Sequence, residues 1–315
     1  MLTFLIILAV LIILYVAVCF IFSRLILYPV RQPIFELPSD YGMDYEDISF
    51  KTSDGLNIAG WYIKGSSDSL LIFTHPFSFN CAGLLATAQG LIWMTKKDIH
   101  FLKTAKTLND EGYSIIMFDF RNHGKSDRSP KGTITLGLTE YKDIEGAVNY
   151  IKSQESLRSK KLGIVSHCMG ADTAIIASTL AKDALKDLKC IVAVQPISMR
   201  VFLTCYLHSS YTQLSLILMP LLNIFIKLRG GYYIDDMSPK AYITEIAVPT
   251  MYVQSIDDPW TNLKEIEKFN VHTNKSEMFM IDGLSERYDT YNYFGDHKEK
   301  LVEFLNRYME PSSDH

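Results

Sequence analysis

The chain begins with an almost unbroken apolar run. Leu2 to Phe22 contains no charged side chain and consists mostly of Leu, Ile, Val, Phe and Ala. About 20 apolar residues are enough to cross the hydrocarbon core of a bilayer as a helix. No basic segment precedes the run and no small-residue cleavage motif ends it, which disfavours the alternative of a cleaved signal peptide. We therefore predict a transmembrane anchor over residues 1–23.

A short proline-containing stretch follows the apolar run. Arg24 and Arg31 lie just beyond the predicted span, and positive residues near a span favour the cytoplasmic side. This predicts a single-pass membrane protein with its folded domain in the cytoplasm. Pro29, Pro33 and Pro38 disfavour helix, so residues 24–44 are predicted to be an extended linker.

From residue 45 the pattern alternates between strands and helices. Tyr45–Lys51 and Asn57–Lys64 alternate apolar and polar residues on either side of an Asp-Gly turn, which indicates a hairpin. Short apolar runs separated by helical periodicity then follow, which is typical of an α/β domain with a parallel sheet. The predicted further strands are 70–74, 113–118, 162–165, 189–194, 248–254 and 277–281, and the predicted helices include 139–154, 171–182 and 297–309. We predict one α/β domain over residues 45–310, with a tail at 311–315.

One segment interrupts this alternation. Residues 197–238 are dense in Leu, Ile, Phe and Tyr and contain Pro220. We interpret the segment as a helical lid inserted over the site. A second membrane-contacting element is the alternative, but Leu214–Leu228 is short for a span and carries the proline.

Composition narrows the functional classes. The chain has 315 residues and a formal net charge of −4, which gives no reason to expect a nucleic-acid partner. Its five cysteines have no paired spacing, so neither a disulfide framework nor a zinc site is predicted, and a reducing compartment fits. No metal or organic cofactor is implied, and nothing in the sequence indicates the oligomeric state.

The predicted strand 162–165 leads into the most informative motif. The order is Ser166-His167-Cys168-Met169-Gly170, followed by the helix-forming segment from Ala171. Small residues two before and two after a central residue let a strand and a helix meet in a sharp turn that exposes the central side chain. The motif thus makes Cys168 a candidate nucleophile. A small buried core residue is the alternative for a cysteine.

The motif and the loops before it resemble the α/β-hydrolase superfamily, with cysteine at the nucleophile position as in dienelactone hydrolases. His75-Pro76-Phe77 and the loop Asp119 to Ser126, which reads Asp-x-Arg-x-His-Gly-x-Ser, match family positions. The resemblance implies an α/β-hydrolase fold with a mostly parallel central sheet flanked by helices. It also implies an oxyanion hole built from the N–H groups of Phe77 and Met169.

The resemblance further implies an acid and a histidine after the lid. Asp258, in Ser255-Ile-Asp-Asp, is the predicted acid, with Asp257 as the fallback and capping of a helix near Trp260 as the structural alternative. The loop after the last strand, where family members carry the histidine, contains none. His297 is the first histidine in the right chain order, so it is the predicted base, with a surface role as the alternative.

Other histidines fit positions that shape the fold. His75 and His123 lie in the two family loops, and His167 precedes the nucleophile.

These residues predict a membrane-anchored hydrolase that cleaves an ester or thioester through an acyl-cysteine. The apolar lid favours a lipophilic acyl group on a small-molecule substrate. Two alternatives stay open. One is an acyltransferase that uses the same cysteine, as in polyhydroxyalkanoate synthases, and the other is a hydrolase-like protein that binds without turnover.

Overall fold

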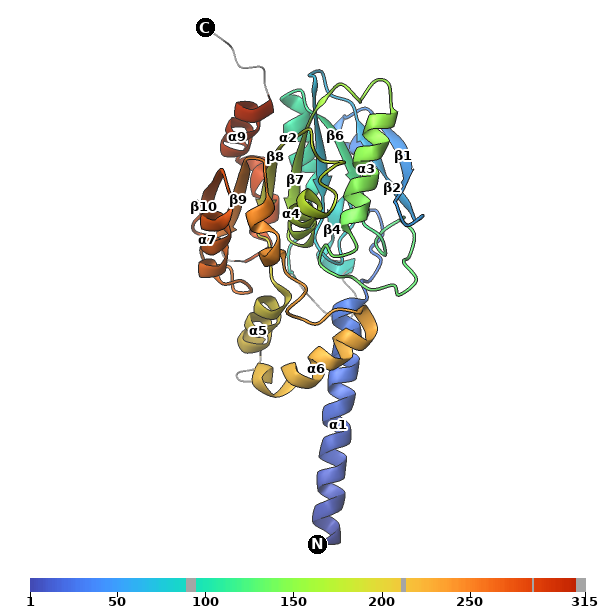
Figure 1. Cartoon of the computed structure of the whole chain (residues 1–315), viewed down its shortest axis with the longest axis vertical. Coiled ribbons are helices and arrows are strands. Elements are labelled where there is room, and N and C mark those ends of the chain that lie inside the picture. Colours follow the sequence, from blue (N-terminus) through green and yellow to red (C-terminus); the bar gives the residue numbers. More distant parts are fainter. Residues whose placement is uncertain (89–94, 211–213, 285, 310–315) are drawn as a thin grey trace.

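The computed structural model describes residues 1–88, 95–210, 214–284 and 286–309 (Figure 1). An eight-stranded sheet in the order β1-β2-β6-β3-β7-β8-β9-β10 forms its centre. β2 pairs antiparallel with β1 and β6, and the other neighbours are parallel. The strands are β1 (Tyr45–Lys51), β2 (Asn57–Ile63), β3 (Ser69–Thr74), β6 (Ser114–Phe118), β7 (Lys161–His167), β8 (Leu188–Val194), β9 (Thr250–Ser255) and β10 (Ser276–Ile281). A separate pair consists of β4 (Gly83–Leu84) and β5 (Ile99–His100).

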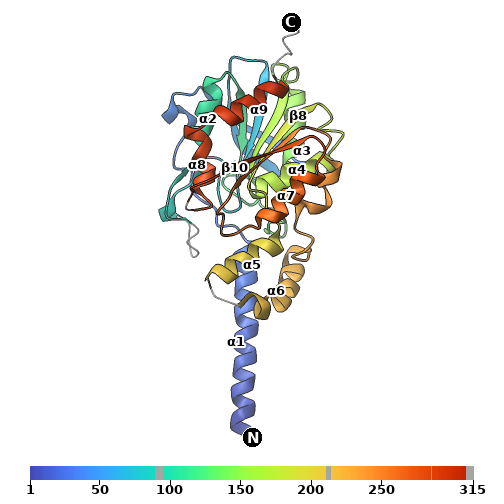
Figure 2. The same cartoon turned by 90° about the vertical axis from the view of Figure 1, so that its left-hand side faces the viewer.

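Helices cover both faces of the sheet, with α2, α8 and α9 on one side and α3, α4 and α7 on the other (Figure 2). The central strands are apolar at consecutive positions because neither face meets water, and β3 is buried at every residue. The mostly parallel sheet predicted from the sequence is confirmed. The helices are α2 (Phe101–Asp110), α3 (Tyr141–Ser153), α4 (Met169–Leu180), α7 (Leu263–His272), α8 (Asp289–Asp296) and α9 (Glu299–Met309).

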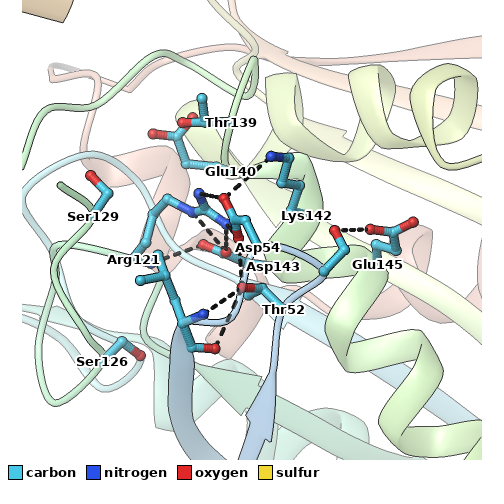
Figure 3. Close-up of polar contacts among 12 residues, drawn as sticks. Thr52, Asp54, Arg121, Ser126, Ser129, Thr139, Glu140, Lys142, Asp143 and Glu145 are labelled. Atoms are coloured by element: carbon cyan, nitrogen blue, oxygen red, sulfur yellow. Dashed lines mark hydrogen bonds and ion pairs between the residues drawn. The ribbon is translucent and has the colours of Figure 1, made fainter. Parts of the chain in front are cut away.

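The Asp-x-Arg-x-His-Gly-x-Ser loop after β6 is held by buried polar contacts. Figure 3 shows Arg121 between two carboxylates: its Nη1 lies 2.8 Å from Asp54 Oδ2, and its Nε lies 2.8 Å from Asp143 Oδ1. The guanidinium thereby ties the β1–β2 turn to α3. Asp119 accepts the backbone N–H of Lys125 at 2.7 Å. These contacts show that the motif builds a fixed loop beside the strand ends.

The apolar helix α1 (Leu2–Leu27) runs four residues past the predicted end of the anchor. Its first half is exposed, whereas Cys19, Ser23, Ile26 and Leu27 are buried against the rest of the chain. Within the described ranges, α1 is the helix that is long and apolar enough to cross a membrane. The predicted linker 24–44 is therefore partly helical and packed.

The predicted lid contains two helices, α5 (Met199–Ser210) and α6 (Leu214–Gly230). α6 packs along α1 below the sheet domain (Figure 1). Tyr15 of α1 donates a hydrogen bond to the carbonyl of Ile217 at 2.7 Å, and Phe20 meets Phe225 edge to face. Several apolar side chains of α6 remain exposed beside α1: Leu216, Ile217, Ile224 and Leu228. The predicted tail at 311–315 lies outside the described residues.

Candidate active site

Cys168 lies in the sharp turn between β7 and α4, as the motif predicts. Its backbone has φ 52° and ψ −116°, a conformation that is strained for a residue with a Cβ. The amide of Cys168 donates to the carbonyl of Val194 at 2.8 Å, which fixes the turn to the next strand. The side chain is 7% exposed and lines a cavity.

The structure explains why small residues stand two before and two after Cys168. A Cβ on Gly170 would lie 2.4 Å from Thr74 Oγ1 and 3.0 Å from the carbonyl oxygen of His75, so strand and helix can approach only with glycine there. Ser166 lies within β7, and its hydroxyl donates to the carbonyl of Val192 at 2.9 Å. The hydroxyl of Ser166 is thereby engaged in the sheet, while the thiol of Cys168 reaches the cavity.

The two predicted oxyanion donors flank this turn. Met169 is the first residue of α4, where backbone N–H groups have no acceptor within the helix. Phe77 follows His75-Pro76 and lines the same cavity as Cys168. Phe77 and Cys168, the residue just before α4, therefore line one cavity, and the helix that begins with Met169 starts beside it.

Asp258 lies after β9 as predicted, but its partner is an arginine. The buried carboxylate forms an ion pair with Arg287, which comes from the loop after β10. Asp258 also accepts the hydroxyl of Thr261 at 2.9 Å. The structural alternative is supported in part, because Asp258 Oδ1 accepts the N–H of Trp260 at 3.0 Å, although the next helix, α7, begins only at Leu263 with Asn262 as its N-cap. Asp257 is exposed.

The structure does not bring His297 to Cys168. His297 is exposed at the end of α8, and its ring lies on that of Tyr293 with centroids 4.6 Å apart. Among the described residues that line the cavity at Cys168, none is a histidine. The loop that carries a histidine in the family instead supplies Arg287, which is 2% exposed.

The other histidines next to the site are buried and shape the backbone. His75 Nε2 accepts the N–H of Phe120 at 3.0 Å, and His123 Nε2 accepts that of Ser78 at 3.2 Å. Burial lowers the pKa of His75 to about 4 and those of His123 and His167 to about 3. These three rings are therefore neutral at ordinary pH.

Two side chains from the β10–α8 region interact with the thiol of Cys168. They are the guanidinium of Arg287 and the hydroxyl of Tyr291. Arg287 Nε also donates to Tyr291 Oη at 3.1 Å, which orients the phenol. Burial raises the pKa of Cys168, while the charge of Arg287 and the hydrogen bond from Tyr291 oppose that rise. The carboxyl of Asp172 adds to the rise, so the pKa of Cys168 stays above its ordinary value and the resting site holds a neutral thiol beside Arg287 and Tyr291.

The cavity at Cys168 is small and mainly apolar, with a volume of about 30 Å³. A second cavity of about 520 Å³ shares four of its lining residues, namely Ile26, Phe77, Phe202 and Trp260. Phe202 lies in α5, so the predicted lid segment contributes to both walls. The two cavities are therefore adjacent, separated by these four side chains, and the larger one offers room for a small-molecule ligand near the thiol.

Sequence reasoning missed Arg287, Tyr288 and Tyr291. All three line the cavity at Cys168. A signal was present, because the expected histidine loop contains an arginine and several tyrosines. Only the fold shows that Arg287 is buried against Asp258 and that the tyrosines turn inward.

Comparisons with known proteins agree with this architecture. The profile of the alpha/beta hydrolase fold family matches residues 90–240. The uncharacterized protein YqkD of Bacillus subtilis is 24% identical over 261 residues, which cover 80% of each chain. Polyketide transferase ATR5 of Stachybotrys chlorohalonatus is 27% identical over 143 residues, covering 45% of this chain and 42% of its own length.

Solved structures give the same result. The esterase PF2001 of Pyrococcus furiosus superposes with a TM-score of 0.68 at 23% identity, covering 90% of this chain and 98% of the esterase. The strand order, the strained turn at Cys168 and these likenesses agree. The chain therefore has an α/β-hydrolase fold.

Proposed function

We propose that this protein is a membrane-anchored enzyme that takes an acyl group from an ester or thioester onto Cys168. The observation that carries the proposal is the Cys168 thiol at a strained turn, facing a cavity next to Arg287 and Tyr291. The similarity to an esterase and to a polyketide transferase supports chemistry of the hydrolase or acyltransferase type.

The first step is acylation. The sulfur of Cys168 attacks the acyl carbon, the bond to the leaving oxygen or sulfur breaks, and the thiol proton passes to the leaving group. The N–H groups of Phe77 and Met169 stabilise the oxyanion, which is typically worth about 3–4 kcal/mol per donor. As the thiol proton leaves during the attack, Arg287 and Tyr291 stabilise the negative charge that develops on sulfur.

The second step depends on what removes the acyl group. Water is a weak nucleophile and needs a general base, but the guanidinium of Arg287 cannot accept a proton at physiological pH. Release to water is therefore slow, and the acyl-cysteine persists until a stronger nucleophile, such as an amine or a thiol, takes the acyl group. The proton of that amine or thiol then passes to the sulfur of Cys168, which becomes a thiol again. Among our two enzymatic interpretations, this geometry favours transfer.

The membrane location is part of the proposal. α1 is apolar enough to span a bilayer, and its exposed half extends away from the folded domain (Figure 2). Arg24, together with Lys227 and Arg229 at the end of α6, lies near the end of α1 that joins the domain. Positive charge there favours the cytoplasmic side for the domain.

The test uses the full chain in lipid nanodiscs and a series of 4-nitrophenyl esters of increasing acyl length. Intact-mass spectrometry is expected to detect one acyl group on the wild type and on Cys205→Ala, the matched control in α5. Cys168→Ala is expected to carry none. Cys168→Ser is expected to carry none either, because a hydroxyl without a base is a far poorer nucleophile than a thiol.

The results have distinct meanings. Addition of hydroxylamine or a thiol should release the acyl group from the wild type faster than buffer alone. An acyl group that remains on Cys168→Ala contradicts the proposed nucleophile.

A second candidate function is acyl binding without turnover. The raised pKa of the buried Cys168 thiol and the arginine in place of a histidine favour it. A wild type that binds the esters but never becomes acylated, even at high pH, would select this candidate over the enzyme.

A further inference from the structure

The larger cavity lies where α1 meets the folded domain. Its walls include Phe22, Leu25 and Ile26 of α1 and Phe202, Leu203 and Tyr206 of α5. Its volume of about 520 Å³ is within the usual range of small-molecule sites. Apolar walls on both sides suit a hydrocarbon chain.

The charged side chains that line this larger cavity are all positive. Arg24, Arg128 and Lys131 line the cavity, and no lining residue described here is acidic. None of these three takes part in an ion pair with another described residue. Burial and the charge of Arg128 lower the pKa of nearby Arg31, while Asp119 and Asp127, which do not line the cavity, oppose that shift. In a chain with net charge −4, this is a local concentration of positive charge that suits an anion.

The cavity lies at the level expected for lipid headgroups. Arg24 follows the apolar run of α1, and Arg229 of α6 donates to Ser23 Oγ at 3.0 Å. α6, which carries exposed apolar residues, lies beside α1 (Figure 1). If α1 spans a bilayer, these arginines mark the boundary between hydrocarbon and headgroups.

We infer that this cavity binds an amphiphile with one acyl chain and a phosphate-bearing head. The phosphate pairs with Arg24, Arg128 and Lys131. The acyl carbonyl reaches Cys168 when the side chains that separate the two cavities move aside. Binding follows from the cavity alone, whereas acylation of Cys168 by this ligand rests on the proposed function. A membrane lysophospholipid and a water-soluble acyl phosphopantetheine share this chemistry.

The experiment measures binding in the full-length Cys168→Ala protein, so that no chemistry is required. The protein is placed in phosphatidylcholine nanodiscs, and quenching of the fluorescence of Trp260, which lines both cavities, reports the ligand. The probes are a brominated monoacylglycerol 3-phosphate, the matching neutral monoacylglycerol and a soluble brominated acyl phosphopantetheine. Trp260→Phe identifies the part of the quenching that comes from the cavity.

Two charge variants make the test specific. The cavity variant carries Arg24→Gln, Arg128→Gln and Lys131→Gln. The control variant loses three exposed lysines, two between α4 and β8 by Lys182→Gln and Lys186→Gln and one in β8 by Lys189→Gln.

We expect a phosphate-bearing probe to bind at least about ten-fold more tightly than the neutral one, with this preference lost in the cavity variant and kept in the control. The probe that binds more tightly, lipid or phosphopantetheine, identifies the source of the ligand. Equal binding of charged and neutral probes, or an equal loss in both variants, would overturn the inference. If the phosphate-bearing probe binds more tightly but Cys168 of the wild type is not acylated, the inference stands and the proposed function is rejected.

Discussion

Ile26 of the apolar helix α1 and Cys168 of the turn before α4 line the same cavity. The predicted anchor thus forms part of the wall around the candidate nucleophile. Ile26 also lines the larger cavity, so it lies between the two. A protein shortened to remove α1 would lose this wall, which is why the experiments here use the full chain.

A bulky residue at position 26 should obstruct the path to Cys168. We expect Ile26→Trp to lower the rate of acylation by long-chain esters at least about ten-fold, while acetyl transfer falls less, because pocket volume discriminates by chain length. Ile21→Trp is the control, since Ile21 is 56% exposed on the same helix. The rate of 4-nitrophenol release across the ester series checks this. Equal effects of the two variants would show that Ile26 does not limit access.

The buried pair of Arg287 and Asp258 should matter strongly for stability. Their side chains are 2% and 0% exposed, so Arg287→Met leaves an uncompensated buried carboxylate. We expect a loss of about 3–5 kcal/mol in the free energy of unfolding, with a smaller loss when Asp258→Asn is added. Denaturant unfolding measures both, and Lys300→Met, which breaks an exposed pair with Glu303, should cost less than about 1 kcal/mol.

Introducing a base should turn the site toward hydrolysis. Arg287→His places an imidazole beside Asp258, and general-base catalysis contributes about 100-fold or more to such steps. We expect acyl-Cys168 to be released to water at least about 100-fold faster than in the wild type, measured by intact mass over time. Arg287→Gln removes the charge without adding a base and should give no gain. A folded Arg287→His protein without faster release would show that position 287 does not face the acyl group.

The close approach at Gly170 should tolerate no side chain. We expect Gly170→Ala to lose about 1–3 kcal/mol of stability, because its methyl would overlap Thr74 and the carbonyl of His75. Gly230→Ala is the control, since a Cβ there meets Leu27 at an ordinary 3.4 Å. Thermal unfolding of both variants checks this. Similar unfolding temperatures for the two proteins would contradict the tight strand-to-helix contact.

The buried neutral histidines predict a loss of stability in mild acid. His75, His123 and His167 have folded pKa values of about 3 to 4, below the ordinary 6.5. Between pH 6.5 and 4 the unfolded chain binds more protons, so their contribution is complete above pH 6.5 and falls as the pH falls. Each histidine adds about 1.4 kcal/mol per pH unit to this slope.

One histidine can be removed to check the slope. His123→Gln keeps a donor and an acceptor, and we expect it to reduce the dependence of unfolding free energy on pH between 6.5 and 4 by one histidine's share. His272→Gln changes an exposed histidine and should leave the slope as in the wild type. Chemical denaturation at several pH values provides the measurement, and an unchanged slope in His123→Gln would show that His123 is not buried neutral.

The sequence by itself determined the sheet and the turn at Cys168. Strands such as β3 could be predicted from consecutive apolar residues, because a strand buried on both faces needs apolar residues at every position. The turn at Cys168 could be predicted because Gly170 meets a local steric requirement between a strand and a helix that are adjacent in the chain. Asp258 was predicted differently, from the resemblance to a family that carries an acid after the strand that follows the lid.

The partners of these residues were decided only by the tertiary structure. Arg287 follows Asp258 by 29 positions, and its burial against that carboxylate depends on how β9 and β10 lie side by side. Ile26 is far from Cys168 in the chain, so no local pattern relates an anchor helix to a nucleophile. Steric requirements and hydrophobic periodicity depend on residues that are close in the chain, so the sequence shows them directly. The charges and walls of a cavity come from distant segments, and only their packing brings them together.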